Sequence, residues 1–386
     1  MKKALIVTFI RADNYGAVLQ CYALQRKLSD IGIDNDVLDY YPKYFFDEYS
    51  MAHLGKLRVF PYRPIGQWIR NTITLLINKK RHQQFEKFIK DNIHLTRKQY
   101  TNNEELVNIK LPYDAYIVGS DQVWNVYINR FDPVYFLDFI GDRNKLKLSY
   151  SASFGFETIP TELTEKYKTW LSGWDTYSVR ESSGASIIMD LLGKEAKVCC
   201  DPTLLLNKRE WEALCNRYRN RETFYKGAYV FVYYVNTKEK MPLDVAKKIA
   251  LEKNAKLICM TSIQSYEELI GRRVATVRGK MYGYASPVDF ISSIRNADTI
   301  VTDSYHGMIF SLLFHKRVLL KIYTNGESNT RMLELINRLD LNCADEMNGF
   351  YNICKNADWE RIDSLLLSYR KESIDYLMQL AKMEIK

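Results

Sequence analysis

The first forty or so residues contain an apolar run, a polar loop and a helical pattern in an order that few folds accommodate. Ala4–Ile10 is a short apolar run, and the polar loop RADNYG follows it directly. Apolar residues recur at helical spacing over Ala17–Ile31, Gly32 is placed to end that helix, and Asp36–Tyr40 resumes extended structure. A strand, loop, helix and strand within about thirty-five residues predict a parallel sheet.

Three more apolar runs end in polar loops, at 116–119, 146–150 and 176–179. With the first unit they predict a doubly wound α/β domain, whose ligands would bind in the loops at the carboxyl ends of the strands. After Leu206 the alternation of strand and helix patterns restarts and continues to Phe314. A chain of 386 residues also exceeds what one hydrophobic core usually organises. We therefore expect two α/β domains and a final helix that packs back on the first domain: 1–206, 207–357 and 358–386.

The composition is that of a soluble globular protein, and it weakens the case for several function classes. No run of about eighteen apolar residues is present, so we expect no membrane-spanning helix. The 7 cysteines are scattered, without a C-x-x-C pair and without neighbouring histidines. This pattern argues against a zinc site and against a disulfide framework. We therefore expect reduced thiols in a cytoplasmic protein. The sequence also lacks the phosphate-loop, dinucleotide-binding and serine-hydrolase motifs.

The most informative stretch is IVTDSYHGMIFSLLF, residues 300–314, in which an apolar strand ends at Asp303 and an apolar helix begins after Gly307. Amide groups at the start of that helix favour an anion, Ser304 can add a hydroxyl donor, and Gly307 lets a ligand approach the backbone. His306 can donate to a phosphate oxygen or carry a proton near neutral pH. In the alternative interpretation, Ser304 only caps the helix and His306 is a buried structural imidazole.

Two arginines are further candidates for anion binding. Arg180 follows the run TYSV directly, so its guanidinium would lie at the carboxyl edge of the sheet. Arg331, in the stretch SNTRMLELI, becomes a candidate only through its resemblance to an arginine that follows a polar loop late in the second domain of a known family. A planar guanidinium suits bidentate binding of a carboxylate or a phosphate. The alternatives are a surface ion pair of Arg180 with Glu181 or Asp175, and an exposed helix-start position for Arg331.

The loop GSDQVWN, residues 119–125, offers groups for a sugar. Asp121 can hydrogen-bond acceptor hydroxyls, position an arginine or act as a base, and Trp124 is the kind of flat apolar side chain that stacks on a sugar face. In the alternative interpretation, Asp121 caps a helix and Trp124 is a core aromatic. Asp13 and Asn14, after the first strand, have the same ambiguity.

Five stretches together carry a resemblance to a known family: NYGAVLQCYAL from Asn14, VGSDQVWN from Val118, SVRE from Ser178, DPTLLL from Asp201 and TDSYHGMIFSLLF from Thr302. In this order they resemble the patterns of the polysaccharide pyruvyl transferases. One departure is that many members carry N-x-G-D after the first strand, whereas this chain has NYGA with Asp13 placed earlier, which leaves an acid role in this loop open. The resemblance implies an α/β fold of two Rossmann-like domains facing across a cleft, similar to GT-B glycosyltransferases.

The resemblance also implies a reaction. The pyruvyl group of phosphoenolpyruvate would move onto two hydroxyls of a sugar in a polysaccharide precursor, forming a pyruvate ketal and releasing phosphate. We expect the first domain to bind the acceptor and the second to bind the donor, with no metal or cofactor. The catalytic candidates are His306, Asp121 and Asp13, the donor-binding candidates are Arg180, Ser304, Gly307 and Arg331, and the acceptor-binding candidates are Asn14, Trp124 and Asn125.

Two other functions stay open from the sequence. A GT-B-like glycosyltransferase would use the same loops for the phosphates of a sugar nucleotide, and a non-catalytic glycan-binding protein would keep the fold alone. Concentrated anion-binding groups speak against the second, because a neutral sugar has little need of them. The remaining histidines are interpreted as structural or exposed: His53, His82, His94 and His315.

Basic residues are concentrated in one segment. The formal net charge is +9, and residues 51–90 carry most of the excess. Apolar residues interleaved with Lys79, Lys80 and Arg81 predict one or two amphipathic helices suited to an anionic membrane surface, where a lipid-linked glycan would be the acceptor. The alternative is a solvated face over a helix packed on the core. Nucleic acid is not favoured, because the aromatic residues follow no binding-module pattern.

Overall fold

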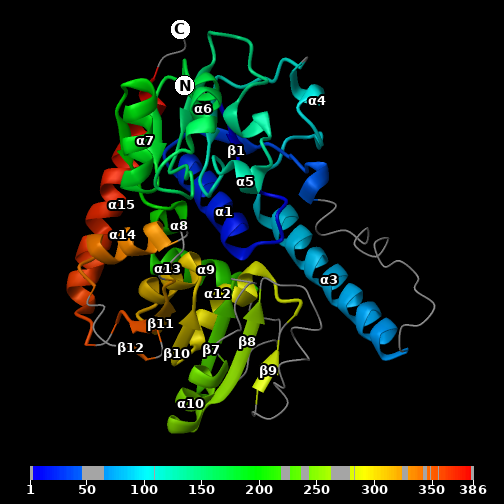
Figure 1. The fold of residues 1–386 in the computed structure, drawn as a ribbon, viewed down its shortest axis with the longest axis vertical. Helices are drawn as coiled ribbons and strands as arrows, with labels where there is room; N and C mark the ends of the chain where they lie inside the picture. Colours follow the sequence, from blue (N-terminus) through cyan, green and yellow to red (C-terminus); the bar gives the residue numbers. More distant parts are fainter. Residues whose placement is uncertain are drawn as a thin grey trace.

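The computed structural model describes residues 3–45, 65–107, 109–218, 227–235, 243–261, 279–281, 283–323, 329–341, 346–347, 349–354 and 356–383. They form two α/β units, with the N-terminal sheet around β1 in the upper half of Figure 1 and the C-terminal sheet around β7 and β8 in the lower half. The predicted fold class, α/β with two Rossmann-like units, is confirmed by the two sheets, and the GT-B-like arrangement of the units stays a prediction. The predicted cleft between them stays a prediction.

The N-terminal sheet has parallel strands in the order β2-β1-β3-β4. Its central strands, β1 (Lys3–Val7) and β3 (Ala115–Val118), are almost wholly buried, as expected of strands covered on both faces. The winding direction reverses between β1 and β3, so the loops after these two strands meet at the topological switch point. Isolated bridges attach a further parallel pair beyond β4. The other strands of this unit are β2 (Asp34–Val37), β4 (Leu146–Ser149), β5 (Tyr177–Val179) and β6 (Ala196–Val198).

The C-terminal sheet has the order β12-β13-β11-β10-β7-β8-β9. Its parallel part, β9-β8-β7-β10-β11, follows the strand order of a Rossmann fold, and the hairpin of β12 and β13 adds an antiparallel edge. The switch point lies between β7 (Tyr229–Tyr234) and β10 (Thr299–Thr302), so the loop that begins at Asp303 leaves the sheet where such folds bind ligands. The other strands are β8 (Lys256–Thr261), β9 (Gly279–Met281), β11 (Arg317–Lys321), β12 (Glu346–Met347) and β13 (Phe350–Asn352).

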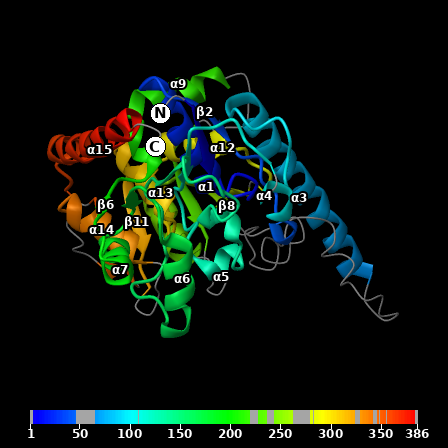
Figure 2. The same cartoon turned by 90° about the horizontal axis from the view of Figure 1, so that it is seen from above.

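Helices surround both sheets, as the two views in Figures 1 and 2 show. Polar residues of the preceding loops cap several of them: Asn14 accepts hydrogen bonds from amides in the first turn of α1, and Asp358 does so for α15. The described helices of four or more residues are α1 (Tyr15–Asp30), α3 (Ile65–Asn92), α4 (Glu104–Val107), α5 (Val126–Asn129), η2 (Pro133–Phe136), α6 (Thr164–Leu171), α7 (Ser182–Leu192), α8 (Pro202–Leu205), α9 (Lys208–Arg217), α10 (Leu243–Glu252), α12 (Pro287–Asn296), α13 (Tyr305–Leu313), α14 (Thr330–Arg338) and α15 (Trp359–Lys382).

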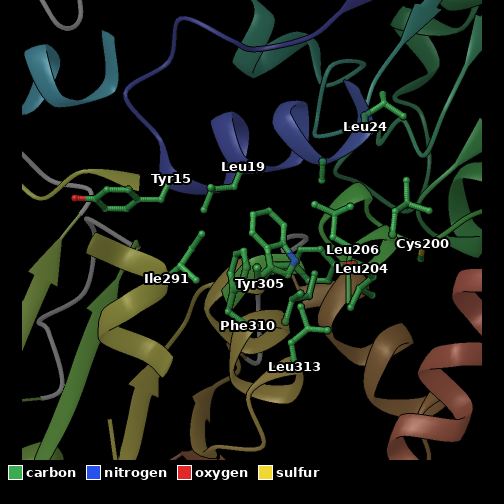
Figure 3. Packing of buried hydrophobic residues seen from close by; sticks show 14 of the residues in the cluster. Tyr15, Leu19, Leu24, Cys200, Leu204, Leu206, Ile291, Tyr305, Phe310 and Leu313 are labelled. Atoms are coloured by element: carbon green, nitrogen blue, oxygen red, sulfur yellow. The ribbon is translucent and has the colours of Figure 1, made fainter. Parts of the chain in front are cut away.

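One hydrophobic core joins the two units. Leu19 of α1 and Phe310 of α13 belong to the same buried cluster, which Figure 3 shows at the junction. The ring of Tyr15 stacks on that of Phe290 with centroids 4.9 Å apart, and its hydroxyl donates to the carbonyl of Ala285 at 3.1 Å. The first turn of α1 is therefore fixed against the C-terminal unit.

The last helix, α15, lies against the N-terminal unit. The hydroxyl of Ser373 accepts a hydrogen bond from the amide of Cys200 at 2.9 Å, and the hydroxyl of Tyr376 donates to the carbonyl of Ser149 at 3.1 Å. We keep the following division into domains as a proposal: 1–206, 207–357 and 358–386.

The described part of the basic segment is a single helix, α3, which projects beyond the body of the molecule in Figure 1. Residues 51–64 of that segment lie outside the described residues. Phe85 and Phe88 are buried in the core, whereas Lys79 and Lys80 are exposed. The described residues include no helix with both the length and the apolar character that crossing a membrane requires.

Arg81 corrects the prediction of a basic surface. Its side chain is fully buried, its guanidinium carbon lies 4.9 Å from the ring centroid of Tyr15, and it donates to the carbonyl of Asp13 at 2.7 Å. Arg81 therefore makes contacts inside the protein and does not contribute to a basic surface. A membrane-facing surface on α3 would have to rely on other basic residues.

Candidate active site

The loop after β10 brings the predicted helix start to the switch point. Ser304 caps α13, because its hydroxyl oxygen accepts a hydrogen bond from the amide of Gly307 at 3.2 Å. A β-carbon on Gly307 would lie 2.7 Å from Oγ1 of Thr302, so this glycine faces its own chain. The helix cap is thus observed, and the binding of an anion by Ser304 and Gly307 stays a prediction.

His306 lies where the two units touch. Its ring packs on the backbone of Gly16, and a β-carbon on Gly16 would lie 2.0 Å from Nδ1 of His306. Nε2 of His306 lies 3.4 Å from Oδ2 of Asp201, which precedes α8. The imidazole is therefore held between the first turn of α1 and a buried carboxyl group.

Asp201 links this histidine to Arg180. Its Oδ1 accepts hydrogen bonds from the amide and the hydroxyl of Thr203, and its Oδ2 accepts one from Nη1 of Arg180 at 2.9 Å. Burial alone would raise the pKa of this carboxyl group, but the charges of His306 and Arg180 outweigh it and hold the pKa of Asp201 well below its ordinary value. Asp201 is therefore a buried carboxylate that faces two basic side chains.

Arg180 leaves the end of β5 with a fully buried side chain. Its Nη2 lies 3.7 Å from Oδ1 of Asp121 and its Nε lies 3.7 Å from Oε2 of Glu181, and both distances are too long for a hydrogen bond. Among the described residues, neither nitrogen has a hydrogen-bond partner. Burial disfavours the charged guanidinium, but Glu181, Asp201 and Asp121 more than compensate and raise its pKa. Asp201 thus binds Nη1 of Arg180, whereas Nε and Nη2 of this arginine are without a hydrogen-bond partner among the described residues.

Arg331 meets Arg180 at the ring of Tyr305. The guanidinium carbons lie 5.0 Å (Arg180) and 5.5 Å (Arg331) from the ring centroid. Glu334 on α14 accepts hydrogen bonds from the amide and hydroxyl of Ser182, which ties α14 to the start of α7. Burial, and next the charge of Arg180, lower the pKa of Arg331. Nε of Arg331 has no hydrogen-bond partner in the part of the chain that the structure describes.

The loop over residues 119–125 reaches these cations through Asp121. This residue has a φ of 73°, in the left-handed region, and its carbonyl accepts a hydrogen bond from the amide of Ser153 at 2.9 Å. That conformation places the carboxylate beside Arg180. This agrees with the interpretation in which Asp121 positions an arginine. Its catalytic role stays a prediction.

Trp124 and Asn125, the predicted acceptor-binding residues of this loop, have structural contacts instead. Trp124 is fully buried and packs on Phe154 and Trp174, with ring centroids 5.0 and 5.6 Å away. The prediction that Trp124 stacks on a sugar is wrong, because neither face of the indole is accessible. Asn125 caps α5 by accepting a hydrogen bond from the amide of Tyr127 at 3.1 Å, which accounts for its position without a ligand.

The predicted residues after β1 contact α1 and α3. Asn14 caps α1 through its side-chain oxygen, which accepts from the amide of Gly16 at 2.9 Å. The carboxylate of Asp13 lies 3.1 Å from Nδ1 of His82 on α3. The structure therefore places Asp13 beside a histidine that sequence patterns marked as structural or exposed.

Arg180, Asp201, Tyr305, His306 and Arg331 form what we call the arginine–histidine cluster. Charge-assisted hydrogen bonds from two guanidiniums suit a compact ligand with two anionic groups. The histidine beside them can carry a proton. Within the described ranges, no three His, Cys, Asp or Glu side chains are grouped as a metal site requires.

The comparison with protein families identifies the family of this chain. The profile of the family described as polysaccharide pyruvyl transferase matches residues 14–325, which is most of the chain and includes every member of the cluster except Arg331. The chain belongs to the polysaccharide pyruvyl transferase family. It is a transferase of polysaccharide pyruvylation. Comparison with curated proteins gives no match.

Several solved structures are similar to this pyruvyl transferase family member in outline, each with a TM-score below 0.5. The UDP-GlcNAc 2-epimerase of Neisseria meningitidis, bound to UDP-GlcNAc, has a TM-score of 0.47 and 10% identity, covering 100% of this chain and 95% of its own. The Methanocaldococcus jannaschii UDP-GlcNAc 2-epimerase, in complex with UDP-GlcNAc and UDP, has a TM-score of 0.46 and 12% identity, covering 96% and 100%. The wall teichoic acid polymerase TagF has a TM-score of 0.45 and 9% identity, covering 98% and 82%.

Three residues of this pyruvyl transferase site were not singled out by the sequence analysis. Asp201 stood in the stretch DPTLLL, and its position just before a proline and an apolar run was the available signal. Tyr305 was hidden by the abundance of tyrosine, with 28 in the chain. Gly16 stood in NYGA, but only its contact with His306 shows that a side chain there would displace the imidazole.

Proposed function

We propose that the protein transfers the pyruvyl group of phosphoenolpyruvate onto two hydroxyls of a sugar in a polysaccharide precursor, forming a pyruvate ketal and releasing phosphate. The observation that carries this proposal is the pair of guanidiniums at Tyr305. Phosphoenolpyruvate has a carboxylate and a phosphate, and Arg180 and Arg331 have donors that no described residue fills. The family supports the transfer of a pyruvyl group.

The members of the cluster have different parts in this proposal. Arg180 and Arg331 bind the two anionic groups of the donor. Ser304 donates its hydroxyl proton to the same ligand, since its oxygen already accepts from the amide of Gly307. His306 contacts the departing phosphate and carries a proton. Asp201 fixes the positions of both His306 and Arg180.

The proposed chemistry balances without an external co-reactant. A proton added to C3 of the donor places positive charge on C2, and the first sugar hydroxyl forms a bond to C2. The bond between C2 and the phosphate oxygen then breaks, and the second hydroxyl closes the ketal. Two hydroxyl protons are released: one balances the proton added to C3, and the other leaves with the phosphate. We therefore expect phosphoenolpyruvate as co-substrate and no cofactor.

Two alternatives use the same fold. A glycosyltransferase would present the arginines to the diphosphate of a sugar nucleotide, and its product would contain an added sugar and no ketal. A non-catalytic glycan-binding protein would have no use for Arg180 and His306 buried at one carboxylate, because burying charged groups is unfavourable without a compensating role. The cluster and the family therefore favour the pyruvyl transferase.

We propose a cytoplasmic location and, as acceptor, a lipid-linked glycan at the inner membrane face. Lys79, Lys80 and Lys87 are exposed on α3, and each basic residue near an anionic surface contributes on the order of 1 kcal/mol. Changing all three to Gln should reduce co-sedimentation with phosphatidylglycerol vesicles at low salt. Failure of the unaltered protein to bind such vesicles would contradict the membrane contact and leave the transfer reaction unaffected.

The transfer itself is tested by its product. The protein is incubated with phosphoenolpyruvate and candidate lipid-linked and free glycans, and the glycans are analysed by mass spectrometry. We expect one glycan to gain the mass of a pyruvate ketal only when phosphoenolpyruvate is present. A product that forms with a sugar nucleotide in its absence would favour the glycosyltransferase.

A further inference from the structure

Asp13 and His82 form a pair that the arginine–histidine cluster does not include. Asp13 lies in the loop after β1, and His82 lies on α3, 69 positions later in the chain. Nδ1 of the imidazole lies 3.1 Å from Oδ1 and 3.2 Å from Oδ2 of the carboxylate. The ring of Tyr41, from the segment after β2, stacks on the imidazole with centroids 6.4 Å apart and planes inclined by 24°. The imidazole is thus oriented by a hydrogen bond and by an aromatic face.

This geometry fixes which ring nitrogen carries the proton. A carboxylate only accepts hydrogen bonds, so Nδ1 of His82 must be the donor to Asp13. In the neutral imidazole Nε2 is then the basic nitrogen, and no hydrogen bond to it is formed by the described residues. The carboxylate side chain is 5% exposed and the imidazole 35% exposed. A buried orienting acid and a partly exposed histidine have the arrangement of a general base.

The charges around His82 come from three segments. Asp13 and Arg11 lie on the loop after β1, Glu86 lies one turn further along α3, and Tyr41 follows β2. Arg11 forms a bidentate ion pair with Asp39 and a second ion pair with Glu86, and these two carboxylates fix its position. The hydrogen bond to Asp13, opposed by burial, raises the pKa of His82 above its ordinary value.

The pair is close to the proposed donor site along the backbone. Asp13 and Gly16 are three residues apart, so their Cα atoms are separated by at most about 11 Å. Gly16 is in contact with the ring of His306. The segment from Asp13 to Gly16 therefore has His82 at one end and His306 at the other. The N-terminal unit contributes the first histidine and the C-terminal unit the second.

From this placement we infer that His82 is the base for an acceptor hydroxyl and that Asp13 positions it. The inference rests on the proposed function. As the hydroxyl oxygen forms its bond to C2, its proton moves to Nε2 of neutral His82. His82 releases this proton to solvent after the ketal has formed, which balances the proton that was added to C3. His306 remains the histidine of the phosphate side. The reaction then has one proton carrier on each side of C2, one from each unit.

A purely structural role for the pair makes different predictions. Arg81 already attaches α3 to this loop by donating to the carbonyl of Asp13 at 2.7 Å, so His82 is not needed to hold the two together. If the pair served only stability, its loss would lower the amount of folded protein and leave the pH dependence of the remaining activity unchanged. If His82 is the base, its pKa instead sets the pH below which kcat falls, because a protonated imidazole cannot accept the hydroxyl proton.

The test compares His82→Gln, Asp13→Asn and a matched control, using the acceptor that gains a ketal in the transfer assay. His315→Gln is the control, because Nε2 of His315 also lies 3.0 Å from an aspartate, Asp363 of α15, and its side chain is similarly 30% exposed. We expect His82→Gln to lower kcat by about 10²- to 10⁴-fold with an unchanged KM for phosphoenolpyruvate. Asp13→Asn should move the acidic limb of the kcat profile to lower pH. His315→Gln should match the wild type.

Histidine NMR gives a second readout without turnover. The ring signal absent from His82→Gln identifies this residue, and its titration should move to lower pH in Asp13→Asn. A folded His82→Gln variant with near-normal kcat overturns the inference, and so does an acidic limb that Asp13→Asn leaves in place. Absence of transfer by the wild type instead removes the proposed function, and the assignment of His82 falls with it.

Discussion

The backbone of Gly16 touches the imidazole of His306 across the junction of the two units: a β-carbon at residue 16 would lie 2.0 Å from Nδ1 and 2.4 Å from Cε1. Gly16→Ala should therefore displace His306 from Asp201, and a displacement of about 1 Å at a reacting group costs on the order of 100-fold in rate. Initial-rate assays and circular dichroism of the variant check this expectation.

The matched control for that variant is Gly141→Ala. Among the described residues, no heavy atom outside Gly141 and its two chain neighbours lies within 4 Å of a β-carbon at this position, so the same change there should leave the rate unaltered. His306→Ala gives the reference loss, about 10²- to 10⁴-fold for a group that carries a proton. Wild-type turnover in Gly16→Ala would mean that the contact with His306 does not matter for the reaction.

Arg331→Lys should raise the KM for phosphoenolpyruvate while keeping the charge, because an ammonium cannot reproduce the planar guanidinium at Tyr305. We expect about tenfold, and a similar effect for Arg180→Lys. Arg338→Lys on the same helix is the control, since Arg338 stacks on Tyr369 and pairs with Glu372 outside the cluster. Unchanged donor saturation in both cluster variants would contradict the role of the two arginines in donor binding.

Asp201→Asn should reduce both stability and turnover. It leaves the fully buried Arg180 without its closest anion, and removing one partner of a buried ion pair costs about 3–5 kcal/mol in the free energy of unfolding. The lowered pKa of Asp201 means that its contribution is present above the carboxyl pKa of the unfolded chain and is lost as the pH falls towards the folded value. Urea denaturation near neutral pH measures the difference. Equal midpoints for variant and wild type would show that the pair adds no stability.

The pair of Asp13 and His82 should stabilise the fold in a pH-dependent way. The pKa of His82 is raised in the folded protein, so its stabilisation is fully present below the unfolded pKa of about 6.5 and is lost as the pH rises through the folded value. The midpoint difference between wild type and Asp13→Asn should therefore be larger at about pH 6 than at about pH 9. A difference that is the same at both pH values would mean that His82 is not charged in the folded state.

The main elements of the fold could be predicted because apolar runs and caps are local signals. The strand over Thr299–Thr302 and the helix entered through Ser304 follow from one stretch of sequence, and the polar loops of separate strands met at one edge because parallel strands all end there. The hairpin of β12 and β13 could not be predicted in this way. Its described strands span Glu346–Met347 and Phe350–Asn352, too short to show an alternation.

The candidate site was predictable only in part, because sequence order does not show which way a loop turns. Trp124 and Asp121 stand in the same loop, but the left-handed backbone at Asp121 directs its carboxylate to Arg180 while Trp124 enters the core. The approach of His82 to Asp13 depends on how α3 packs against the first loop. No local pattern contains that information.

A crystal structure with phosphoenolpyruvate bound tests the central claim most directly. The proposed function predicts that the carboxylate and the phosphate lie within hydrogen-bond distance of Arg180 and Arg331 beside Tyr305, with the phosphate facing His306. The guanidinium nitrogens Nε and Nη2 of Arg180 and Nε of Arg331 should then have ligand oxygens as partners. Donor density elsewhere in the molecule, with both arginines in contact only with protein, would contradict it.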